Sequence, residues 1–123
     1  MICFDTNIII YLGNGTLHED ILNAELICYA SVTRIESLGN PDILSAEEQR
    51  IEELLITMTE IPLNEPILQA AVHLRQLKKM SLGDAIVAAT ALEHNATLWT
   101  ANTADFQHIE GLKLVNPLEK QAL

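Results

Sequence analysis

The chain has 123 residues, of which 49% are hydrophobic and 20% charged, and its formal net charge is −10. This length suggests one compact domain over residues 1–123, and the composition excludes disordered and collagen-like chains. No apolar run approaches the roughly 20 residues that span a bilayer, and the start of the chain lacks the basic region of a signal peptide. Cys3 and Cys28 are too few for a disulfide scaffold, so we expect reduced core thiols in a cytoplasmic protein with no membrane association.

The charge is unusual for a protein that would handle nucleic acid. Seventeen acidic residues stand against seven basic ones, and affinity for RNA or DNA comes mainly from basic residues that neutralise phosphates. A nucleic-acid enzyme of this charge would need metal ions, a local basic face or a partner. Aromatic residues make up only 4% and lie in apolar surroundings, so we do not expect a stacking platform for single strands.

The first quarter of the chain predicts two strands with helical segments between them. Met1–Phe4 is a short apolar run that predicts a buried strand ending at Asp5. Asn7–Leu12 predicts a short helix, which glycines then break. Thr16–Ala24 begins like a capping box and predicts a second helix. Leu26–Ser31 is apolar and predicts the second strand.

The middle of the chain predicts three helices and one short strand. Thr33–Leu38 is a helical segment, and Ser45–Met58 is a clearer helix that Ser45 could cap. Thr59–Leu63 predicts a short strand. Asn64–Met80 is a long amphipathic helix with a proline in its first turn.

The last third predicts a buried helix between strands. Ser81 and Asp84 form another capping-box start, which opens the alanine-rich helix Ala85–His94. Thr97–Thr100 predicts a strand, Ala101–Phe106 a turn into a short helix, and Leu112–Val115 a last strand. Strands and helices therefore alternate, which predicts an α/β domain with a mostly parallel sheet.

Four acidic residues occupy positions where such a sheet binds ligands. Asp5, Glu36 and Asp105 each follow a predicted strand, and Asp84 opens the alanine-rich helix. Ligands bind beyond the carboxyl ends of strands in open parallel sheets. Carboxylates gathered there would repel one another unless cations lay between them, and oxygen ligands favour Mg²⁺ or Mn²⁺. Such a site suits phosphodiester hydrolysis.

Each acid also has an ordinary structural interpretation. Asp5 could cap a helix, and Asp84 could complete a capping box. Asp105 could be an acid in a turn or in the first turn of a helix, where the helix dipole stabilises negative charge, and Glu36 could face solvent. The competing chemistries are weaker. The histidines are scattered without metal-ligand spacing, and neither a nucleophilic triad nor a glycine-rich phosphate loop is present.

A small group of basic residues precedes Asp84. Arg75, Lys78 and Lys79 have the spacing of one helical face. They could simply be basic residues in the last turn of a helix, where the helix dipole stabilises positive charge. The alternative hypothesis is that this face, together with Arg34, contacts RNA phosphates.

Several segments, in order, resemble the motifs of PIN-domain ribonucleases, and length and order resemble the VapC-type toxins of toxin–antitoxin pairs. The segments are Asp5-Thr6-Asn7, Ile35-Glu36, the run from Leu82 to Ala91, the run from Leu98 to Phe106, and the run from Gly111 to Pro117. The resemblance spans nearly the whole chain. Each motif is common alone, but the ordered set is fairly specific.

The resemblance implies a three-layer α/β/α domain that is a metal-dependent endoribonuclease. It places Mg²⁺ or Mn²⁺ on Asp5, Glu36, Asp84 and Asp105, with support from Asn7, Thr100 and Asn102. It further implies an RNA substrate such as tRNA or rRNA, a small antitoxin partner and a homodimer. One departure concerns Ala101, because many relatives carry a basic residue there. The expected reaction is hydrolysis that leaves a 5′-phosphate and a 3′-hydroxyl.

Other functions remain as alternatives. A PIN fold that has lost activity would be a binding module, and four retained acids argue against it without proving turnover. An acidic receiver-like signalling domain would need a lysine after its last strand, where Asn116 and Pro117 stand. A haloacid-dehalogenase-like phosphatase would need an acid at Asn7.

Overall fold

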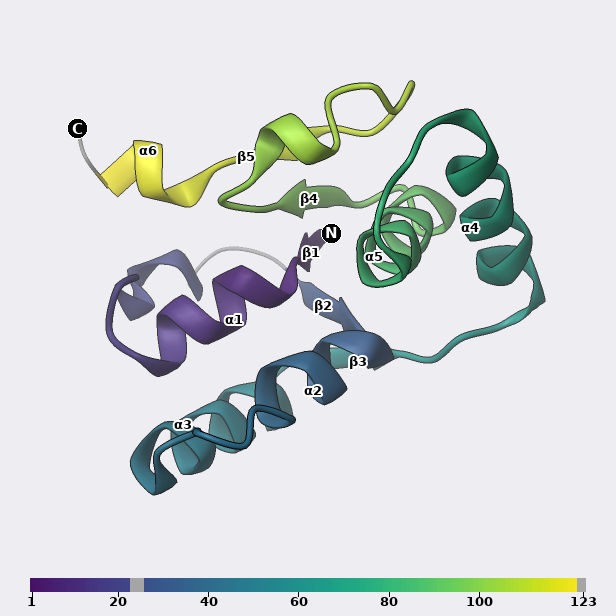
Figure 1. The fold of residues 1–123 in the computed structure, drawn as a ribbon. Helices are drawn as coiled ribbons and strands as arrows, with labels where there is room; N and C mark the ends of the chain where they lie inside the picture. The colour runs from purple at the N-terminus through teal and green to yellow at the C-terminus, as the bar shows by residue number, and fades with distance from the viewer. Residues whose placement is uncertain (23–25, 122–123) are drawn as a thin grey trace.

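The computed structural model describes residues 1–22 and 26–121 of the chain. Its centre is a five-stranded sheet with the order β3-β2-β1-β4-β5, in which every neighbouring pair is parallel. The strands are β1 (Ile2–Phe4), β2 (Ile27–Ala30), β3 (Thr59–Ile61), β4 (Thr97–Trp99) and β5 (Leu114–Val115). Helices cover both faces of this sheet (Figure 1), which confirms the predicted three-layer α/β/α fold with a parallel sheet.

The helices alternate with the strands as the sequence predicts. They are α1 (Thr6–Gly13), α2 (Ser31–Leu38), α3 (Ser45–Ile56), α4 (Glu65–Leu77), α5 (Leu82–Glu93) and α6 (Pro117–Gln121), with short 3₁₀ helices η1 (Glu19–Leu22) and η2 (Thr103–Asp105). Helix α6 was not predicted. Among residues 1–22 and 26–121, every helix is too short or too polar to cross a membrane.

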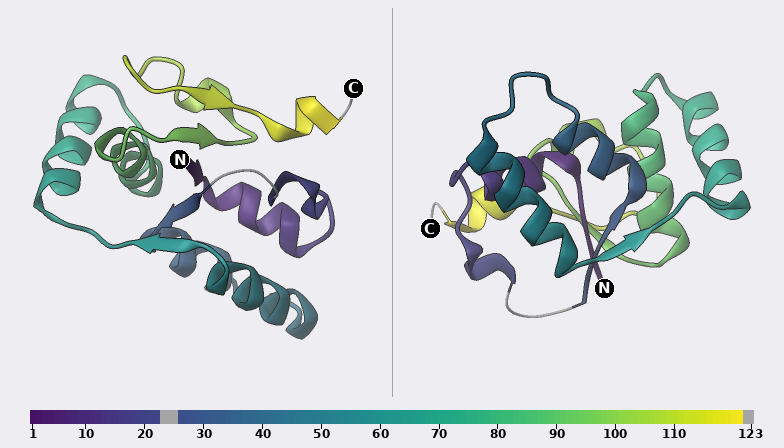
Figure 2. Two further views of the ribbon diagram at one scale, coloured as in Figure 1. Left: turned by 180° about the vertical axis from the view of Figure 1, so that it is seen from behind. Right: turned by 90° about the horizontal axis from the view of Figure 1, so that it is seen from below.

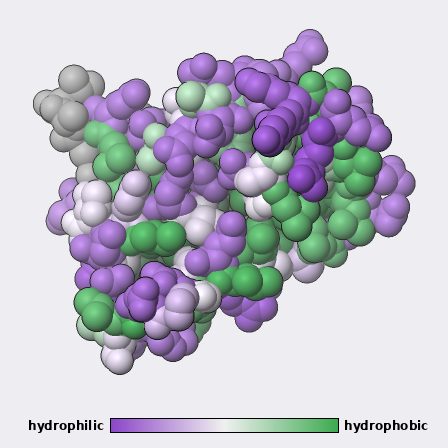
Figure 3. Space-filling model, viewed as in Figure 1, coloured by the Kyte–Doolittle hydropathy of each residue, from purple (hydrophilic) through white to green (hydrophobic). Residues whose placement is uncertain are grey.

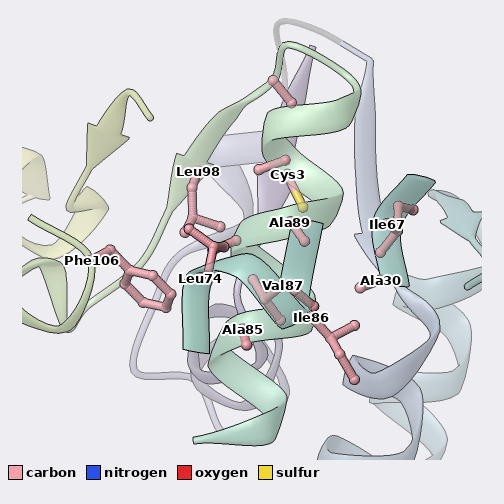
Figure 4. Close-up of a cluster of buried hydrophobic side chains, with 14 of the residues drawn as sticks. Cys3, Ala30, Ile67, Leu74, Ala85, Ile86, Val87, Ala89, Leu98 and Phe106 are labelled. Carbon is pink, nitrogen blue, oxygen red and sulfur yellow. The ribbon is translucent and has the colours of Figure 1, made fainter. Parts of the chain in front are cut away.

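The strands send alternate side chains into two separate cores. Ile2 and Phe4 of β1 join a cluster with α1 and α3, whereas Cys3 joins a cluster with α4 and α5. This follows from the period-two geometry of a strand. Figure 2 shows the two helical groups on opposite sides of the sheet, and Figure 4 shows the cluster around α5. Both faces of the sheet are therefore buried.

Helix α5 packs against the sheet with small side chains. Ala85, Ala88 and Ala89 are completely buried in the cluster that it shares with the strands. Helix α4 packs along α5, and its Ile67 and Leu74 reach the same cluster. The alanine-rich run therefore allows a close approach that fixes the first turn of α5, and with it Asp84, beside the sheet.

Two predicted helix starts differ from the structure. The helix predicted over Thr16–Ala24 is only the 3₁₀ turn η1, because the Thr16 amide donates to Asn14 Oδ1 and Leu17 is buried instead of opening a helix. Asn23 and Ala24 lie outside the described residues. Ser45 is the first residue of α3 rather than its cap, and Leu44 occupies the cap position.

Helix α4 is also shorter than predicted. It ends at Leu77, and Lys78 already has an extended backbone, so the residues up to Met80 form a loop. The Arg75 side chain stabilises this loop by donating from Nε to the Met80 carbonyl at 3.3 Å. The loop leads to Ser81, which caps α5 by accepting from the Asp84 amide at 3.1 Å, as the capping-box pattern predicts.

Candidate active site

Four acids lie along the carboxyl edge of the parallel sheet. Asp5 directly follows β1 and is the N-cap of α1, and Glu36 lies on α2, which follows β2. Asp105 ends η2, which follows β4, and Asp84 lies in the first turn of α5. Because parallel strands present their carboxyl ends at one edge, residues far apart in sequence meet there.

Asp5 is the buried centre of this edge. Its side chain is 5% exposed, and donors reach both carboxylate oxygens. Oδ1 accepts from the Thr6 amide at 2.8 Å, whereas Oδ2 accepts from the Thr100 hydroxyl at 2.8 Å and from Asn7 Nδ2 at 3.2 Å. A carboxylate oxygen has two lone pairs, so Oδ1 retains one for a further ligand. Asp5 therefore caps α1 and can still bind a further ligand through its carboxylate.

Thr100 and Asn7 form a polar support beneath Asp5. The Thr100 hydroxyl is fully buried, donates to Asp5, and accepts from the Asn102 amide at 3.0 Å and from Asn7 Nδ2 at 3.4 Å. Asn7 Oδ1 accepts from the Ala101 amide at 3.2 Å. These contacts hold the end of β4 against the start of α1. Asn102 takes part through its backbone, while the residue itself is exposed.

The electrostatics link the four acids into one group. Burial raises the pKa of Asp5 to about 6, although hydrogen bonds from Thr100 and Thr6 oppose the rise, and the Asp84 and Glu36 carboxylates add to it. Burial likewise raises the pKa of Asp84, and the charges of Asp105 and Glu36 contribute. The structure therefore places the other carboxylates near enough for their charges to disfavour the ionisation of Asp5 and Asp84.

Two residues that hold Glu36 do not stand out in the sequence. The Thr6 hydroxyl donates to Glu36 Oε1 at 2.7 Å and lies 3.1 Å from the Thr33 hydroxyl. Gly83 lies against the same carboxylate, since a Cβ atom there would be 2.6 Å from Glu36 Oε2. The signal for Thr6 was its place between Asp5 and Asn7. A side chain at Gly83 would push the Glu36 carboxylate aside, a relationship that only the meeting of α2 and α5 reveals.

A small cavity of about 210 Å³ joins the acids to basic residues. Its lining residues are Lys78, Lys79, Met80, Ser81, Asp84, Ala104 and Asp105. The other two candidate RNA-binding residues are engaged elsewhere. Arg34 forms an ion pair with Glu60, at 3.0 Å between Nε and Oε1, and Arg75 bonds the Met80 carbonyl. The lysines therefore stand beside the acids, whereas the two arginines have structural partners.

The donor set fits a hard divalent cation. The ligating atoms would all be carboxylate oxygens, the type that Mg²⁺ and Mn²⁺ prefer. Within residues 1–22 and 26–121, however, no three His, Cys, Asp or Glu side chains already stand in an arrangement that could hold one ion. The acids share the edge of the sheet without forming a closed coordination sphere.

The fold and this acidic edge together define a class of protein, a parallel α/β domain with carboxylates at the carboxyl ends of its strands. A family profile described as "PIN domain" matches residues 2–112, and the chain belongs to the PIN-domain family. The resemblance seen in the sequence is thereby confirmed. A search of curated proteins found no match.

Solved structures with the same fold come from toxin–antitoxin complexes. A chain of a toxin–antitoxin complex from Klebsiella pneumoniae is 32% identical, with a TM-score of 0.76 over 95% of this chain and 98% of that chain. A chain of VapBC-1 from nontypeable Haemophilus influenzae is 25% identical, with a TM-score of 0.75 over 94% and 98%. VapBC2 from Rickettsia felis, bound to a DNA fragment from its promoter, is 22% identical with a TM-score of 0.80 over 94% and 98%, and it shows the fold alone.

Proposed function

We propose that this chain is a Mg²⁺- or Mn²⁺-dependent endoribonuclease and the toxin of a toxin–antitoxin pair, working in the cytoplasm. One observation carries the proposal. Asp5 is nearly buried, is held by three donors, and lies close enough to Asp84 and Glu36 for their charges to raise its pKa. A buried carboxylate among other carboxylates is costly without a cation, and such sites are typical of function rather than stability.

Asp5, Glu36, Asp84 and Asp105 would hold the cation. When bound, a divalent cation supplies Lewis-acid stabilisation of the charge that develops on a phosphate undergoing hydrolysis. The chain's own residues orient the ligands. Thr100 and Asn7 fix the position of Asp5, and the hydrogen bond from Thr100 favours its ionised form.

Glu36 has a separate support. Thr6 holds Oε1 of Glu36, and the bare backbone of Gly83 leaves room for Oε2. Glu36 is exposed, unlike Asp5. It therefore suits either a further metal ligand or a group that orients the attacking water.

Lys78 and Lys79 would bind the RNA backbone next to the acids. Both are exposed, both line the cavity that contains Asp84 and Asp105, and within the described part of the chain neither pairs with a carboxylate. This local positive charge is the means by which a chain of net charge −10 approaches a polyanion. The substrate class we propose is a structured RNA such as tRNA or rRNA.

A small antitoxin and a second copy of the chain are the proposed protein partners. Solved relatives are chains of toxin–antitoxin complexes, and the acidic edge would accept a basic side chain from such a partner. Leu68 and Val72 are exposed on α4, and Figure 3 shows hydrophobic surface on the side formed by α4 and α5. An exposed apolar face of this kind suits a homodimer interface.

The experiment that tests the proposal is cleavage of a defined tRNA pool with Mg²⁺ or Mn²⁺, with EDTA in a parallel reaction. Asp84→Asn serves as the matched variant, because it keeps the shape of the side chain and removes the charge. We expect metal-dependent cleavage by the natural chain, products with 5′-phosphate and 3′-hydroxyl ends, and no cleavage by the variant. Products with 2′,3′-cyclic phosphate ends would contradict the hydrolytic mechanism.

A binding module without activity is the second candidate. The observation in its favour is that no three described acids are arranged to hold one ion. Calorimetric titration with Mn²⁺, combined with the cleavage assay, separates the two candidates. An inactive module would bind the ion or RNA without cutting tRNA or rRNA under any metal condition, whereas the nuclease would bind the ion and cut the RNA.

A further inference from the structure

The two cysteines face each other across neighbouring strands. Cys3 of β1 and Cys28 of β2 are register partners in the parallel sheet. Both side chains are 0% exposed and belong to the same hydrophobic cluster, so they point to the same face of the sheet. Figure 4 shows the Cys3 sulfur in this cluster, close to α5. Both thiols are free.

Their geometry suits a covalent link. Neighbouring strands in a sheet lie about 4.8 Å apart, and a disulfide needs two Cα atoms roughly 4.4–6.8 Å apart. A direct register pair on one face of the sheet meets this requirement. The register pairing and the shared hydrophobic cluster place the two thiol groups side by side on one face of the sheet.

We propose that Cys3 and Cys28 form a modification site at which a small peroxide converts the two thiols into an intramolecular disulfide. This inference goes beyond the nuclease function and does not depend on it. Because both sulfur atoms are buried, the oxidant must be small and must enter when the sheet opens briefly. Hydrogen peroxide, which is close to water in size, fits this requirement better than a bulky disulfide.

The chemistry balances in two steps. One thiol sulfur attacks the O–O bond of the peroxide, becomes a sulfenic acid and releases one water. The second thiol sulfur then attacks the sulfenic sulfur, the S–S bond forms and a second water leaves. The two thiols lose two electrons and two hydrogens in all, and these reduce one peroxide to two waters. A dithiol reductant reverses the link by exchange.

The link would join two strands that lead directly into the acidic edge. Asp5 follows β1 by one residue, and β2 continues into α2, which carries Glu36. The bond would also close a loop that contains all of α1. Such a loop restricts the unfolded chain, so the oxidised protein should unfold at a higher temperature than the reduced protein.

The test treats the metal-free protein with an equimolar amount of hydrogen peroxide, then denatures it in N-ethylmaleimide and measures its intact mass. We expect a monomer that is two hydrogens lighter and takes up no maleimide. A proteolytic map should show Cys3 linked to Cys28. Dithiothreitol should restore two reactive thiols and the lower unfolding temperature.

Cys28→Ala and Cys3→Ala are the matched variants. Each leaves one thiol in the same buried position, so neither should form the link, and peroxide should not raise its unfolding temperature. If a variant does not fold, the oxidised natural chain is compared with the same chain after reduction by dithiothreitol, which should restore the lower unfolding temperature. Two thiols that remain reactive after peroxide, a sulfinic or sulfonic acid without a link, or a disulfide between two chains would each overturn the proposal.

Discussion

The Thr100 hydroxyl donates a 2.8 Å hydrogen bond to Asp5 Oδ2, across 95 residues of sequence. This bond joins the end of β4 to the end of β1 and favours the ionised form of a carboxylate whose pKa is raised by burial. The same hydroxyl accepts from the Asn102 amide. Thr100 is therefore the point where two neighbouring strand ends and the central acid are connected.

Thr100→Val should reduce both stability and activity. The change leaves Asp5 and the Asn102 amide with one partner fewer in a buried site, at a cost of about 1–3 kcal/mol in unfolding free energy. We expect RNA cleavage to fall about tenfold to hundredfold, because the support of a metal ligand is lost. Chemical denaturation and cleavage rates measure the two effects.

Thr90→Val is the control for Thr100→Val. Thr90 is also buried, and its hydroxyl donates to the Ile86 carbonyl within α5 at 2.7 Å, away from Asp5. It should lose stability with cleavage unchanged in the folded protein. Thr100→Ser should keep most of the activity. Equal losses of cleavage in the two valine variants would contradict a special role for Thr100.

Gly83→Ala should separate activity from stability. Alanine favours a helix over glycine by up to roughly 1 kcal/mol, so α5 itself should not be weakened. The new Cβ would lie 2.6 Å from Glu36 Oε2, and the carboxylate must move. We expect weaker Mn²⁺ binding and about tenfold slower cleavage, with an unfolding temperature close to that of the natural chain.

The same substitution on a Glu36→Ala background tests the cause. Without the carboxylate there is nothing for the new methyl group to displace, so Gly83→Ala should have no further effect on cleavage. A second loss of similar size in the double variant would show that Gly83 acts through something other than Glu36.

The stability of the metal-free protein should depend on pH through Asp5. Its folded pKa is about 6, against an ordinary value of 3.8 for aspartate, so protonation favours the folded state. The stabilisation is fully present below the lower pKa and is lost as pH rises through about 6. In EDTA, the unfolding free energy should therefore rise as the pH falls from 7.5 to about 4, by roughly 2.4 kcal/mol from this group.

Asp5→Asn supplies the reference for the pH effect. The asparagine does not titrate. The unfolding free energy of the natural chain should therefore rise relative to that of the variant as the pH falls. Urea denaturation at several pH values gives both curves. A difference that stays constant from pH 4 to 7.5 would contradict a raised pKa for Asp5.

Removing both lysines of the cavity should weaken RNA binding and reduce its dependence on salt. Each phosphate contact to a single strand contributes a slope of about −0.7 in a plot of log affinity against log salt. Lys78→Ala with Lys79→Ala should therefore flatten the slope by about 1.4. Binding is measured with Asp84→Asn in the background, so that the RNA stays intact.

Lys113→Ala is the matched control for the lysine pair. Lys113 is exposed and lies just before β5, at the opposite edge of the sheet from the acids. Removing Lys113 changes the net charge by the same amount as removing either Lys78 or Lys79. It should nevertheless change the slope of the salt dependence little. An unchanged slope in the double variant would remove Lys78 and Lys79 from the RNA-binding surface.

The sequence by itself determined the order of the elements and the class of fold. Alternating apolar strands and helices predicted the parallel sheet, and the alanine-rich run predicted a helix pressed against it. The position of each acid after a strand placed Asp5, Glu36 and Asp105 at one edge. Local patterns suffice for these features because strand and helix periods, caps and strand ends are properties of short segments.

Only the tertiary structure decided which side chains meet. The pairing of Arg34 with Glu60, the contact of Gly83 with Glu36, and the facing thiols of Cys3 and Cys28 join residues far apart in the chain. No local pattern encodes them, because they depend on strand order and register. The capping pattern at Ser45 was wrong for a related reason: a cap is decided by where the chain enters the helix, and here it enters one residue earlier.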